Sequence, residues 1–364
     1  MKIAIFGDVP IPSYMAHSIT RMHLCEALAV NNEVDFFVPN RSDSVNCDDG
    51  VYSFYGVDEI FKITEIPKLK PSRIFYDIVL KYVVHKGDYD LFFTSSIAAL
   101  SSVIKLKVDV LYEMHQPLNQ QNMSLLVKNS KKSNFRGIVV ISDPLKEYCI
   151  NHGILEDQIL VCRSSTKINK FISGIDYRSK FKLNNEKKTI GYAGSMYIGK
   201  GIEKILEISK ENVDLNFLIA GVNINNIDFN EYENVFWVGK LKPSEVHGFL
   251  SGCDVLLMPY SESVESYGGN SDIGKYMSPT KLFEYIGAGK PIISSDLEIL
   301  KIEGIKHCVI YASDSVLDWS LHIRDILNDP VKYDELCREY GRIVGEYSYD
   351  KKVVAITEFL NKNK

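Results

Sequence analysis

The stretch Tyr276-Met-Ser-Pro-Thr-Lys-Leu-Phe-Glu-Tyr-Ile-Gly-Ala-Gly-Lys-Pro-Ile-Ile-Ser-Ser-Asp296 decides the fold of the C-terminal half, because it predicts a loop, a helix, a tight turn and a buried strand in succession. Ser278 is a suitable N-cap, and Pro279 suits the first helical position, where its missing N–H would be unpaired anyway. Apolar residues then recur at helical spacing. Gly289 and Pro291 end the helix, and the two isoleucines that follow predict a strand inside a sheet.

Lys281 lies in the first turn of this predicted helix, where the helix dipole disfavours a cation. A bound anion would reverse that effect, because the free N–H groups and the ammonium would both serve it. Glu284 follows one turn later, off the apolar stripe and on the face that it shares with Thr280 and Lys281. A carboxylate placed there is suited to accept hydrogen bonds from sugar hydroxyls. The pattern therefore favours a site for a phosphate and a sugar.

A similar junction lies upstream. Residues 189–194 predict a strand that ends in glycine, residues 195–201 form a loop, and an amphipathic helix begins at residue 202. Lys200 stands at the N-terminal end of that helix, where the dipole again disfavours it. A single lysine of this kind is more often a solvated loop residue. Two of them on strand–loop–helix junctions of one domain favour an anion site.

These two motifs resemble the donor domain of GT-B glycosyltransferases of family 4, the retaining glycosyl transferases group 1. The motifs are Gly-Tyr-Ala-Gly-Ser followed by Lys200-Gly201, and Ser-Pro-Thr-Lys-Leu-Phe-Glu284-Tyr followed by Gly-Lys-Pro and Ser-Asp296. The resemblance covers nearly the whole chain. It implies that Lys200 holds a nucleotide diphosphate, that the second loop and helix start face the phosphates, and that Glu284 binds the nucleotide ribose. The implied donor-binding residues are Gly194, Ser195, Lys200, Ser278, Pro279, Thr280, Lys281 and Glu284.

Length and composition indicate the general class of the protein. A chain of 364 residues, 45% hydrophobic and 24% charged, is typical of a soluble globular protein with two domains. The formal net charge of -5 argues against a nucleic-acid partner. The seven cysteines are scattered without a C-x-x-C, so neither zinc nor a disulfide framework is expected. The first residues turn polar too soon for a signal peptide, and no apolar run approaches the roughly 20 residues of a membrane span. We therefore expect a cytoplasmic protein.

Strands alternate with helices along the chain, which predicts parallel sheets wound on both faces. In the first half we expect strands at 2–6, 34–38, 91–94, 108–112, 137–141 and 159–162, short strands at 52–55 and 60–62, and helices at 15–30 and 72–84. In the second half we expect strands at 189–193, 215–220, 235–238, 254–258 and 309–311, with helices at 244–250, 315–327, 333–343 and 351–361.

The pattern restarts near residue 189, which indicates two Rossmann-like domains. We expect an acceptor-binding domain over residues 1–165, a linker over 166–188 and a donor-binding domain over 189–345. The resemblance implies that a last helix, over 346–364, crosses back to the first domain. The expected fold class is α/β of the GT-B type, two doubly wound parallel-sheet domains that face a central cleft, with the ligand at the carboxyl ends of the strands.

His115 is the main candidate of the first domain, because it follows a strand at the end where α/β active sites form. The resemblance implies a histidine here that touches the donor sugar and helps to hold it over the diphosphate. The alternative is a hydrogen-bonded turn histidine. Glu113 is a second polar candidate in the same turn. His17 and Ser18, near the start of the first helix, are candidates for acceptor binding; the alternative for His17 is a surface histidine.

The chain departs from the resembled pattern in two places. The first loop carries Pro10 and Pro12 where the family often has paired glycines, so this loop is stiffer. The first glutamate of the family's paired acidic motif is replaced by Tyr276. Residues in the loop over 261–277, which we expect to close over the donor, are candidates to take its place. These residues are Glu262, Glu265 and Asp272.

Three further groups have plain interpretations. Asp88-Tyr-Asp90 resembles a D-x-D metal motif, but it precedes a strand and is better explained as a turn. Arg163 and Lys167 are best explained as linker charges. A basic cluster is either a solvated helix end or a contact for anionic lipid. Its residues are Lys128, Lys131, Lys132 and Arg136.

The sequence therefore predicts an enzyme that uses a nucleotide-diphosphate sugar. The resemblance implies a retaining, metal-independent glycosyltransferase that moves the sugar to a saccharide or lipid-linked acceptor, in bacterial surface polysaccharide synthesis. No cofactor is expected. His115, Lys200 and Glu284 are the expected catalytic residues, with charge stabilisation of the leaving diphosphate as the mechanism. Two alternatives stay open: a nucleotide-sugar epimerase of the same shape, and a non-catalytic nucleotide-sugar-binding partner of a transferase. The base, the sugar and the acceptor are not specified.

Overall fold

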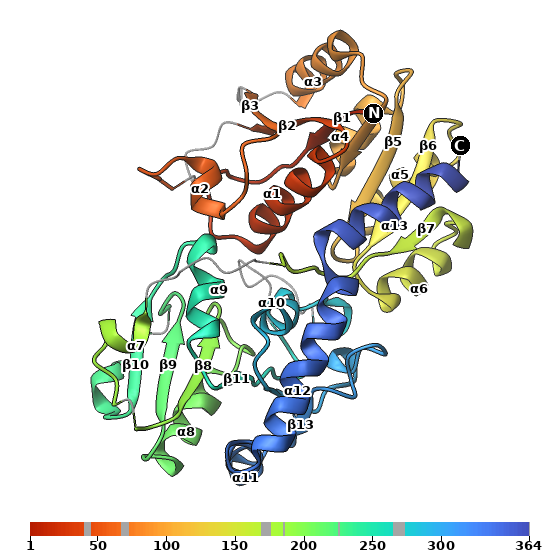
Figure 1. Ribbon diagram of the computed structural model, residues 1–364. Coiled ribbons are helices and arrows are strands. Elements are labelled where there is room, and N and C mark those ends of the chain that lie inside the picture. Colours follow the sequence, from red (N-terminus) through yellow and green to blue (C-terminus); the bar gives the residue numbers. More distant parts are fainter. Residues whose placement is uncertain are drawn as a thin grey trace. The chain divides into compact units, whose positions relative to one another are not determined.

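The computed structural model describes residues 1–39, 45–66, 73–168, 176–184, 186–224, 226–264 and 274–363, with the backbone alone for residues 73–77. The chain forms two compact units (Figure 1). Unit 1 comprises Met1–Arg163 together with Tyr349–Lys364, and unit 2 comprises Ser164–Ser348. Each unit is an α/β structure built on its own parallel sheet.

Unit 1 contains a seven-stranded parallel sheet in the order β3-β2-β1-β4-β5-β6-β7. Its strands are β1 (Lys2–Phe6), β2 (Glu33–Pro39), β3 (Lys62–Ile66), β4 (Leu91–Thr94), β5 (Asp109–Met114), β6 (Phe135–Val140) and β7 (Ile159–Val161). Its helices are α1 (Ala16–Ala29), α2 (Val51–Tyr55), α3 (Arg73–Gly87), α4 (Ile97–Val103), α5 (Gln120–Ser130), α6 (Asp143–Asn151) and α13 (Tyr349–Lys362). The central strands are mostly apolar because helices cover both faces of the sheet, and Glu113 of β5 is a buried exception.

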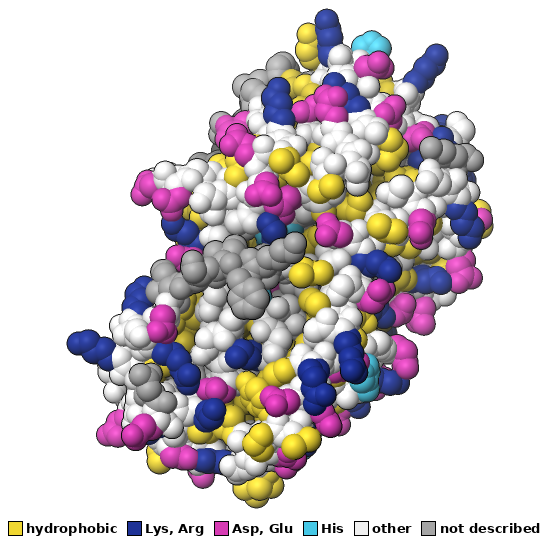
Figure 2. All heavy atoms as spheres, in the orientation of Figure 1, with side chains coloured by type: hydrophobic (Ala, Val, Ile, Leu, Met, Phe, Trp, Pro, Cys, Tyr) yellow, Lys and Arg dark blue, Asp and Glu magenta, His cyan; other side chains and the backbone are white. Residues whose placement is uncertain are grey.

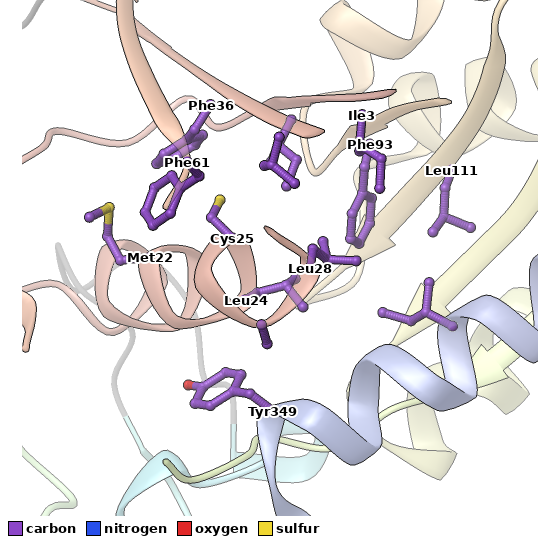
Figure 3. Packing of buried hydrophobic residues seen from close by; sticks show 14 of the residues in the cluster. Ile3, Met22, Leu24, Cys25, Leu28, Phe36, Phe61, Phe93, Leu111 and Tyr349 are labelled. Carbon is purple, nitrogen blue, oxygen red and sulfur yellow. The ribbon is translucent and has the colours of Figure 1, made fainter. Parts of the chain in front are cut away.

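The core of unit 1 joins the two ends of the chain. Cys25 of α1 is fully buried and points toward Phe36 of β2 and toward Phe61 (Figure 3). On the other side of α1 lies Tyr349, the first residue of α13. Helix α13 therefore packs as an integral part of unit 1, although more than 180 residues of unit 2 precede it in the sequence.

Unit 2 contains a six-stranded parallel sheet in the order β10-β9-β8-β11-β12-β13. Its strands are β8 (Thr189–Ala193), β9 (Asn216–Ala220), β10 (Val235–Gly239), β11 (Val255–Met258), β12 (Ile292–Ser295) and β13 (Ile310–Ala312). Its helices are α7 (Tyr177–Lys180), α8 (Ile202–Glu211), α9 (Pro243–Ser251), α10 (Thr280–Ala288), α11 (Val316–Asn328) and α12 (Pro330–Ile343).

Two apolar clusters cover the two faces of the sheet of unit 2. One cluster includes Phe249 of α9, Phe283 of α10 and Tyr340 of α12. The other includes Ile205 of α8 and Trp319 of α11. The apolar stripes of these helices account for their formation, because each helix buries one stripe against the sheet. Because helices cover both faces of this sheet, the loops at the ends of its strands are the parts left accessible to a ligand.

The strand order of each sheet identifies the loops between which a ligand is expected to bind. In each sheet the order reverses once, between β1 and β4 in unit 1 and between β8 and β11 in unit 2. Loops that leave the carboxyl ends of strands at such a reversal diverge, and ligands of open α/β sheets bind between them. In unit 2 these are the loops after β8 and β11.

Most expected elements are confirmed, and three details are wrong. Residues 52–55 are helical, as part of α2, because Phe54 and Tyr55 are buried side by side on a helical turn rather than alternating. The strand expected at 60–62 begins at Lys62, where β3 pairs with β2. Residues 177–183, expected as linker, belong to unit 2, because Tyr177 and Leu183 are buried in its core.

The surface shows mixed charge. Over the described residues on the face drawn in Figure 2, basic and acidic side chains are intermixed. Among the described residues, none of the helices combines the length and the apolar character that crossing a bilayer requires.

Candidate functional site

The centre of the candidate site in unit 2 is the Lys281 ammonium in the first turn of α10. The Lys281 residue is 7% exposed, and its Nζ has no hydrogen-bond partner among the described residues. It lies 3.7 Å from the centroid of the Tyr192 ring and 5.1 Å from that of Tyr260. Cation–π contact offsets part of the lost hydration but supplies no oxygen ligand. A buried cation without an anionic partner is costly, so this position is prepared for an anion.

Burial also changes the proton affinity of this amine. It lowers the pKa of Lys281 well below its ordinary value, and the charge of Lys200 adds to that effect, while Glu284 opposes it. An anion bound at the ammonium would favour the charged form and raise the pKa again. Anion binding and protonation of the Lys281 amine therefore favour each other.

A glycine makes room for this lysine. A Cβ atom on Gly194, at the end of β8, would lie 2.8 Å from Lys281 Cε and 2.9 Å from its Nζ. Any larger residue would push the ammonium out of its place between the tyrosine rings. The glycine of the first motif thus serves the lysine of the second, a relation that the sequence did not reveal.

Lys200, the second lysine, lies across the same tyrosine. Its Nζ is 4.7 Å from the centroid of the Tyr260 ring, so one ring contacts both ammonium groups. Burial lowers the pKa of Lys200 to about 8. The backbone turn before Lys200 is held by Tyr192, whose hydroxyl lies 3.0 Å from the carbonyl oxygen of Ser195 and 3.2 Å from that of Lys200. The two lysines predicted from separate motifs are therefore brought together.

The loop that carries Lys200 is held against the loop after β11. Gly199 and Gly201 have φ angles of +83° and +81°, which favour glycine. A Cβ on Gly199 would lie 2.2 Å from the carbonyl oxygen of Ser263, and one on Gly201 would lie 1.8 Å from that of Pro259. Both glycines are required by backbone shape and by close approach, and Gly201 is also the N-cap of α8.

Glu284 lies one turn along α10 from Lys281 and is half-buried. Burial raises the pKa of Glu284 to about 7, and the Lys281 charge limits the rise. At neutral pH the carboxylate is thus close to its titration point. A ligand that donates hydrogen bonds to it would favour the ionised form.

The start of α10 differs from the prediction. Pro279 is the N-cap and the helix begins at Thr280, so Ser278 does not cap it. The Ser278 hydroxyl instead accepts a hydrogen bond of 2.8 Å from the Ser164 N–H, and the Ser164 hydroxyl donates to the Ser278 carbonyl at 2.7 Å. Ser278 is buried, whereas Thr280 is half-buried, so these two implied donor-binding residues are not equally accessible.

In unit 1, His115 follows the last residue of β5 and contacts Glu113. The His115 Nε2 lies 3.2 Å from Oε2 of Glu113. Burial alone would raise the pKa of Glu113, but the charges of Arg21, His115 and Lys352 outweigh it and hold the pKa well below its usual range. Glu113 is therefore a buried carboxylate anion, and His115 is its hydrogen-bond donor.

The two residues expected to bind the acceptor lie near each other but differ in exposure. The exposed His17 ring packs edge-on against His115, with 4.5 Å between centroids. The charge of His115 lowers the pKa of His17, with burial as a second cause, and solvent screens part of this effect. Ser18 is fully buried, and its hydroxyl donates to the Pro10 carbonyl at 2.9 Å, which holds the first loop. Acceptor binding by either residue stays a prediction.

The remaining candidates have simpler positions. Glu262 is exposed, while Glu265 and Asp272 lie outside the described residues. The Asp90 carboxylate accepts a hydrogen bond from the Lys2 N–H at 2.7 Å, which fits the turn interpretation of Asp88-Tyr-Asp90. Arg163 pairs with Asp143. Among the described residues, no group of three or more His, Cys, Asp or Glu side chains is placed to hold a metal ion.

Sequence reasoning missed the aromatic part of the site. Tyr192 lies within β8 and Tyr260 just after β11, and each resembled a core residue of a buried strand. Tyr285 was missed in the same way. Its hydroxyl accepts from the Ala193 N–H at 3.0 Å and lies 3.3 Å from the Leu257 carbonyl, which ties α10 to both strands at the reversal. The available signal was that each of these three residues is a tyrosine within or close to one of the two lysine motifs, where a purely apolar core residue would have been enough.

The chain is a two-unit α/β protein with a candidate anion site in unit 2, and comparison with known proteins bears on its fold. Residues 175–344 match the model of the family described as "Glycosyl transferases group 1". A curated relative is "Putative teichuronic acid biosynthesis glycosyltransferase TuaH" of Bacillus subtilis (strain 168), 29% identical over 113 residues. That alignment covers 30% of this chain and 26% of the relative, so the chain spans about a quarter of the curated relative.

Solved structures are similar over the whole chain. Anabaena Alr3699/HepE in complex with UDP has a TM-score of 0.71 and 14% identity, with 100% of both chains covered. A glycosyltransferase from Rickettsia africae ESF-5 has a TM-score of 0.74 and 14% identity, again with 100% of both chains covered. Likeness at this identity shows the fold, and the predicted GT-B class of two Rossmann-like parallel-sheet units is confirmed.

Proposed function

We propose that this protein is a retaining, metal-independent glycosyltransferase that moves a sugar from a nucleotide-diphosphate sugar to a saccharide or lipid-linked acceptor. A place in bacterial surface polysaccharide synthesis is part of the proposal. Support comes from the group 1 domain and from the teichuronic acid relative. The part of the site suited to a diphosphate contains the ammonium groups of Lys200 and Lys281. It also contains the N-termini of α8 and α10.

The observation that carries the proposal is the Lys281 ammonium, buried and without a hydrogen-bond partner among the described residues. A structural lysine would pair with a carboxylate or reach solvent. This one is held between tyrosine rings beside a second lysine, at the strand reversal where α/β ligands bind. A diphosphate supplies the charge that these two ammonium groups lack.

The proposed mechanism is electrostatic. Departure of the nucleoside diphosphate develops negative charge, which Lys200, Lys281 and the N-terminus of α10 stabilise. The acceptor hydroxyl attacks the anomeric carbon from the face that the diphosphate leaves, and its proton goes to the leaving phosphate. The C–O bond to the diphosphate breaks as the new glycosidic bond forms, with retention. His115 orients the sugar, and Glu284 binds the ribose.

UDP-sugars are the first donors to test, because a structural relative was solved with UDP. A thermal-shift screen of UDP-, GDP- and ADP-sugars compares the bases directly, since a ligand that binds the folded state raises its melting temperature. We expect one base class to raise it. No rise with any nucleotide sugar would contradict the donor assignment.

Turnover separates the proposal from its alternatives. We expect purified protein to release nucleoside diphosphate from the donor slowly by hydrolysis, and faster when a saccharide or lipid-linked acceptor is added. An epimerase would convert the donor sugar without releasing nucleotide, and a non-catalytic partner would bind the donor without changing it. Either result would contradict the transferase assignment.

Peripheral membrane contact at the cytoplasmic face belongs to the same proposal, through a cluster of exposed lysines at the end of α5, Lys128, Lys131 and Lys132. Arg136, predicted in the same cluster, pairs with Asp109 at 2.7 Å. Cosedimentation with anionic and neutral vesicles tests the contact, because a polybasic patch favours the anionic surface. Equal binding to both would contradict it.

A further inference from the structure

The carboxylate of Glu113 contacts basic side chains from three separate parts of unit 1. The Nη2 atom of Arg21, on α1, lies 2.7 Å from Oε2. The Nζ atom of Lys352, on α13, lies 3.3 Å from Oε1. The Nε2 atom of His115, in the turn after β5, lies 3.2 Å from Oε2. One carboxylate thus joins the first helix, the fifth strand and the last helix of the chain.

Glu113, Arg21 and Lys352 are all buried, and they comprise two cations and only one anion. Glu113 is 1% exposed, and Arg21 and Lys352 are each 5% exposed. The Arg21 guanidinium lies 5.2 Å from the Phe93 ring centroid, and its Nη1 has no hydrogen-bond partner among the described residues. Two buried cations against one carboxylate are a weak source of stability, because desolvation of the ions offsets their attraction. The arrangement is better explained by what it does to its fourth member, His115.

The contact fixes the orientation of the imidazole. A carboxylate anion accepts hydrogen bonds and donates none, so the ring nitrogen that faces Glu113 must carry a proton. That nitrogen is Nε2. In the neutral imidazole, Nδ1 is then the acceptor nitrogen, and it can accept a hydrogen bond from a donor such as a sugar hydroxyl. The His115 side chain is 16% exposed, so it is partly accessible, whereas Glu113 is enclosed.

We propose that Glu113 is a positioning residue that holds the Nε2–H of His115 and leaves Nδ1 for a substrate hydroxyl, and that Arg21 and Lys352 hold the Glu113 carboxylate in place. This inference rests on the proposed function for the role of His115 toward the donor sugar. It gives α13 a part in the site, because Lys352 reaches Glu113 across 239 positions of sequence. It also predicts that the sugar group at His115 is a hydroxyl rather than a carboxylate.

The test uses a variant that keeps the buried charge unchanged. Glu113→Gln alone would leave two buried cations unpaired and is expected to unfold more easily. Adding Lys352→Met removes one cation with the one anion, so the double variant has the same summed charge as the wild type. Lys352→Met alone is the matched control, because it keeps the contact between Glu113 and His115.

The first readout is the tautomer of His115, by long-range ¹H–¹⁵N NMR of the histidine rings at about pH 8. We expect the proton on Nε2 in the wild type and in Lys352→Met. In the Glu113→Gln, Lys352→Met double variant we expect the Nδ1–H form to appear, because a glutamine amide donates as well as accepts. An Nδ1–H tautomer in the wild type, or an unchanged tautomer in the double variant, would overturn the proposal.

The second readout separates turnover from binding. In the double variant we expect kcat for donor hydrolysis to fall roughly ten- to hundredfold, with the UDP dissociation constant within about twofold of the wild type. Full kcat in the double variant would overturn the role in turnover. If wild-type protein fails to bind UDP or turn over any donor, the proposed function fails instead, while the tautomer still tests the Glu113 contact.

Discussion

At the scale of single residues, Glu284 is the most direct test of ribose binding. We expect Glu284→Ala to lose roughly ten- to hundredfold in kcat/KM, because hydrogen bonds to a charged group are worth about 1.5–3 kcal/mol. Steady-state kinetics with the donor found in the thermal-shift screen measure it. Glu284→Gln, which keeps the size and one acceptor oxygen, should lose less. A fully active Glu284→Ala variant would show that the ribose binds elsewhere.

The same residue carries a stability prediction. Burial raises the pKa of Glu284 to about 7, so between its unfolded value and about pH 7 the folded state holds more protons than the unfolded state. Stability contributed by this residue therefore falls as pH rises through that interval and stays low above it. We expect Glu284→Gln to melt a few degrees higher than wild type at about pH 8, and the difference to shrink at about pH 5. A variant that gained nothing at the higher pH would contradict the raised pKa.

Lys200 sets an upper limit in pH for donor binding. Its pKa is lowered to about 8 by burial, so in the free protein its ammonium is lost as pH rises through that value. We expect UDP affinity to fall by up to about tenfold between about pH 7 and about pH 9, measured by calorimetry. Lys200→Arg is the control, because a guanidinium stays charged, and its affinity should fall less over the same range. Equal slopes for both proteins would contradict a role for the Lys200 charge.

At the scale of elements, Tyr285 ties helix α10 to the strand reversal. Its hydroxyl accepts from the buried Ala193 N–H and lies within hydrogen-bond distance of the Leu257 carbonyl. Tyr285→Phe leaves that N–H without a partner, which costs about 1–3 kcal/mol. We expect the melting temperature to drop by several degrees and UDP binding to weaken, because the start of α10 carries Lys281.

The control for this change is Tyr311→Phe. The Tyr311 hydroxyl lies 3.2 Å from the Leu300 carbonyl, in a partly buried place, so its loss leaves an acceptor rather than an N–H. We expect a smaller drop in melting temperature and unchanged UDP affinity. Equal effects of the two substitutions would contradict the special role of Tyr285.

The element boundaries show which sequence signals suffice. Long apolar strands and amphipathic helices, such as β8 and α8, were predicted within a residue or two, because burial on one or two faces fixes their pattern. The short helix α2 was missed because its aromatic residues suit a strand equally well. Ser278 was expected to cap α10, but a tertiary hydrogen bond to Ser164 takes its hydroxyl instead.

At the scale of the whole molecule, the two doubly wound sheets follow from the alternation of strands and helices, and the comparisons agree with that prediction. The site was only partly predictable. Charged residues at helix starts stand out from the sequence, so Lys200 and Lys281 were found. Tyr192 and Tyr260 were not, because an apolar ring beside a strand resembles core. The contact between Glu113 and Lys352 depends on α13 joining unit 1, which the family resemblance implies, but no local pattern indicates which side chains then meet.

The central claim is that the buried Lys281 amine, whose Nζ has no hydrogen-bond partner among the described residues, binds a diphosphate. Calorimetric titration of UDP into wild-type and Lys281→Met protein at about pH 7.5, in two buffers of different ionisation enthalpy, tests it most directly. Because burial lowers the pKa of Lys281 and a bound anion raises it again, we predict net proton uptake on binding to the wild type, and for Lys281→Met a roughly ten- to hundredfold weaker complex with less uptake. A Lys281→Met variant that bound UDP as tightly as wild type, with the same proton uptake, would contradict the account.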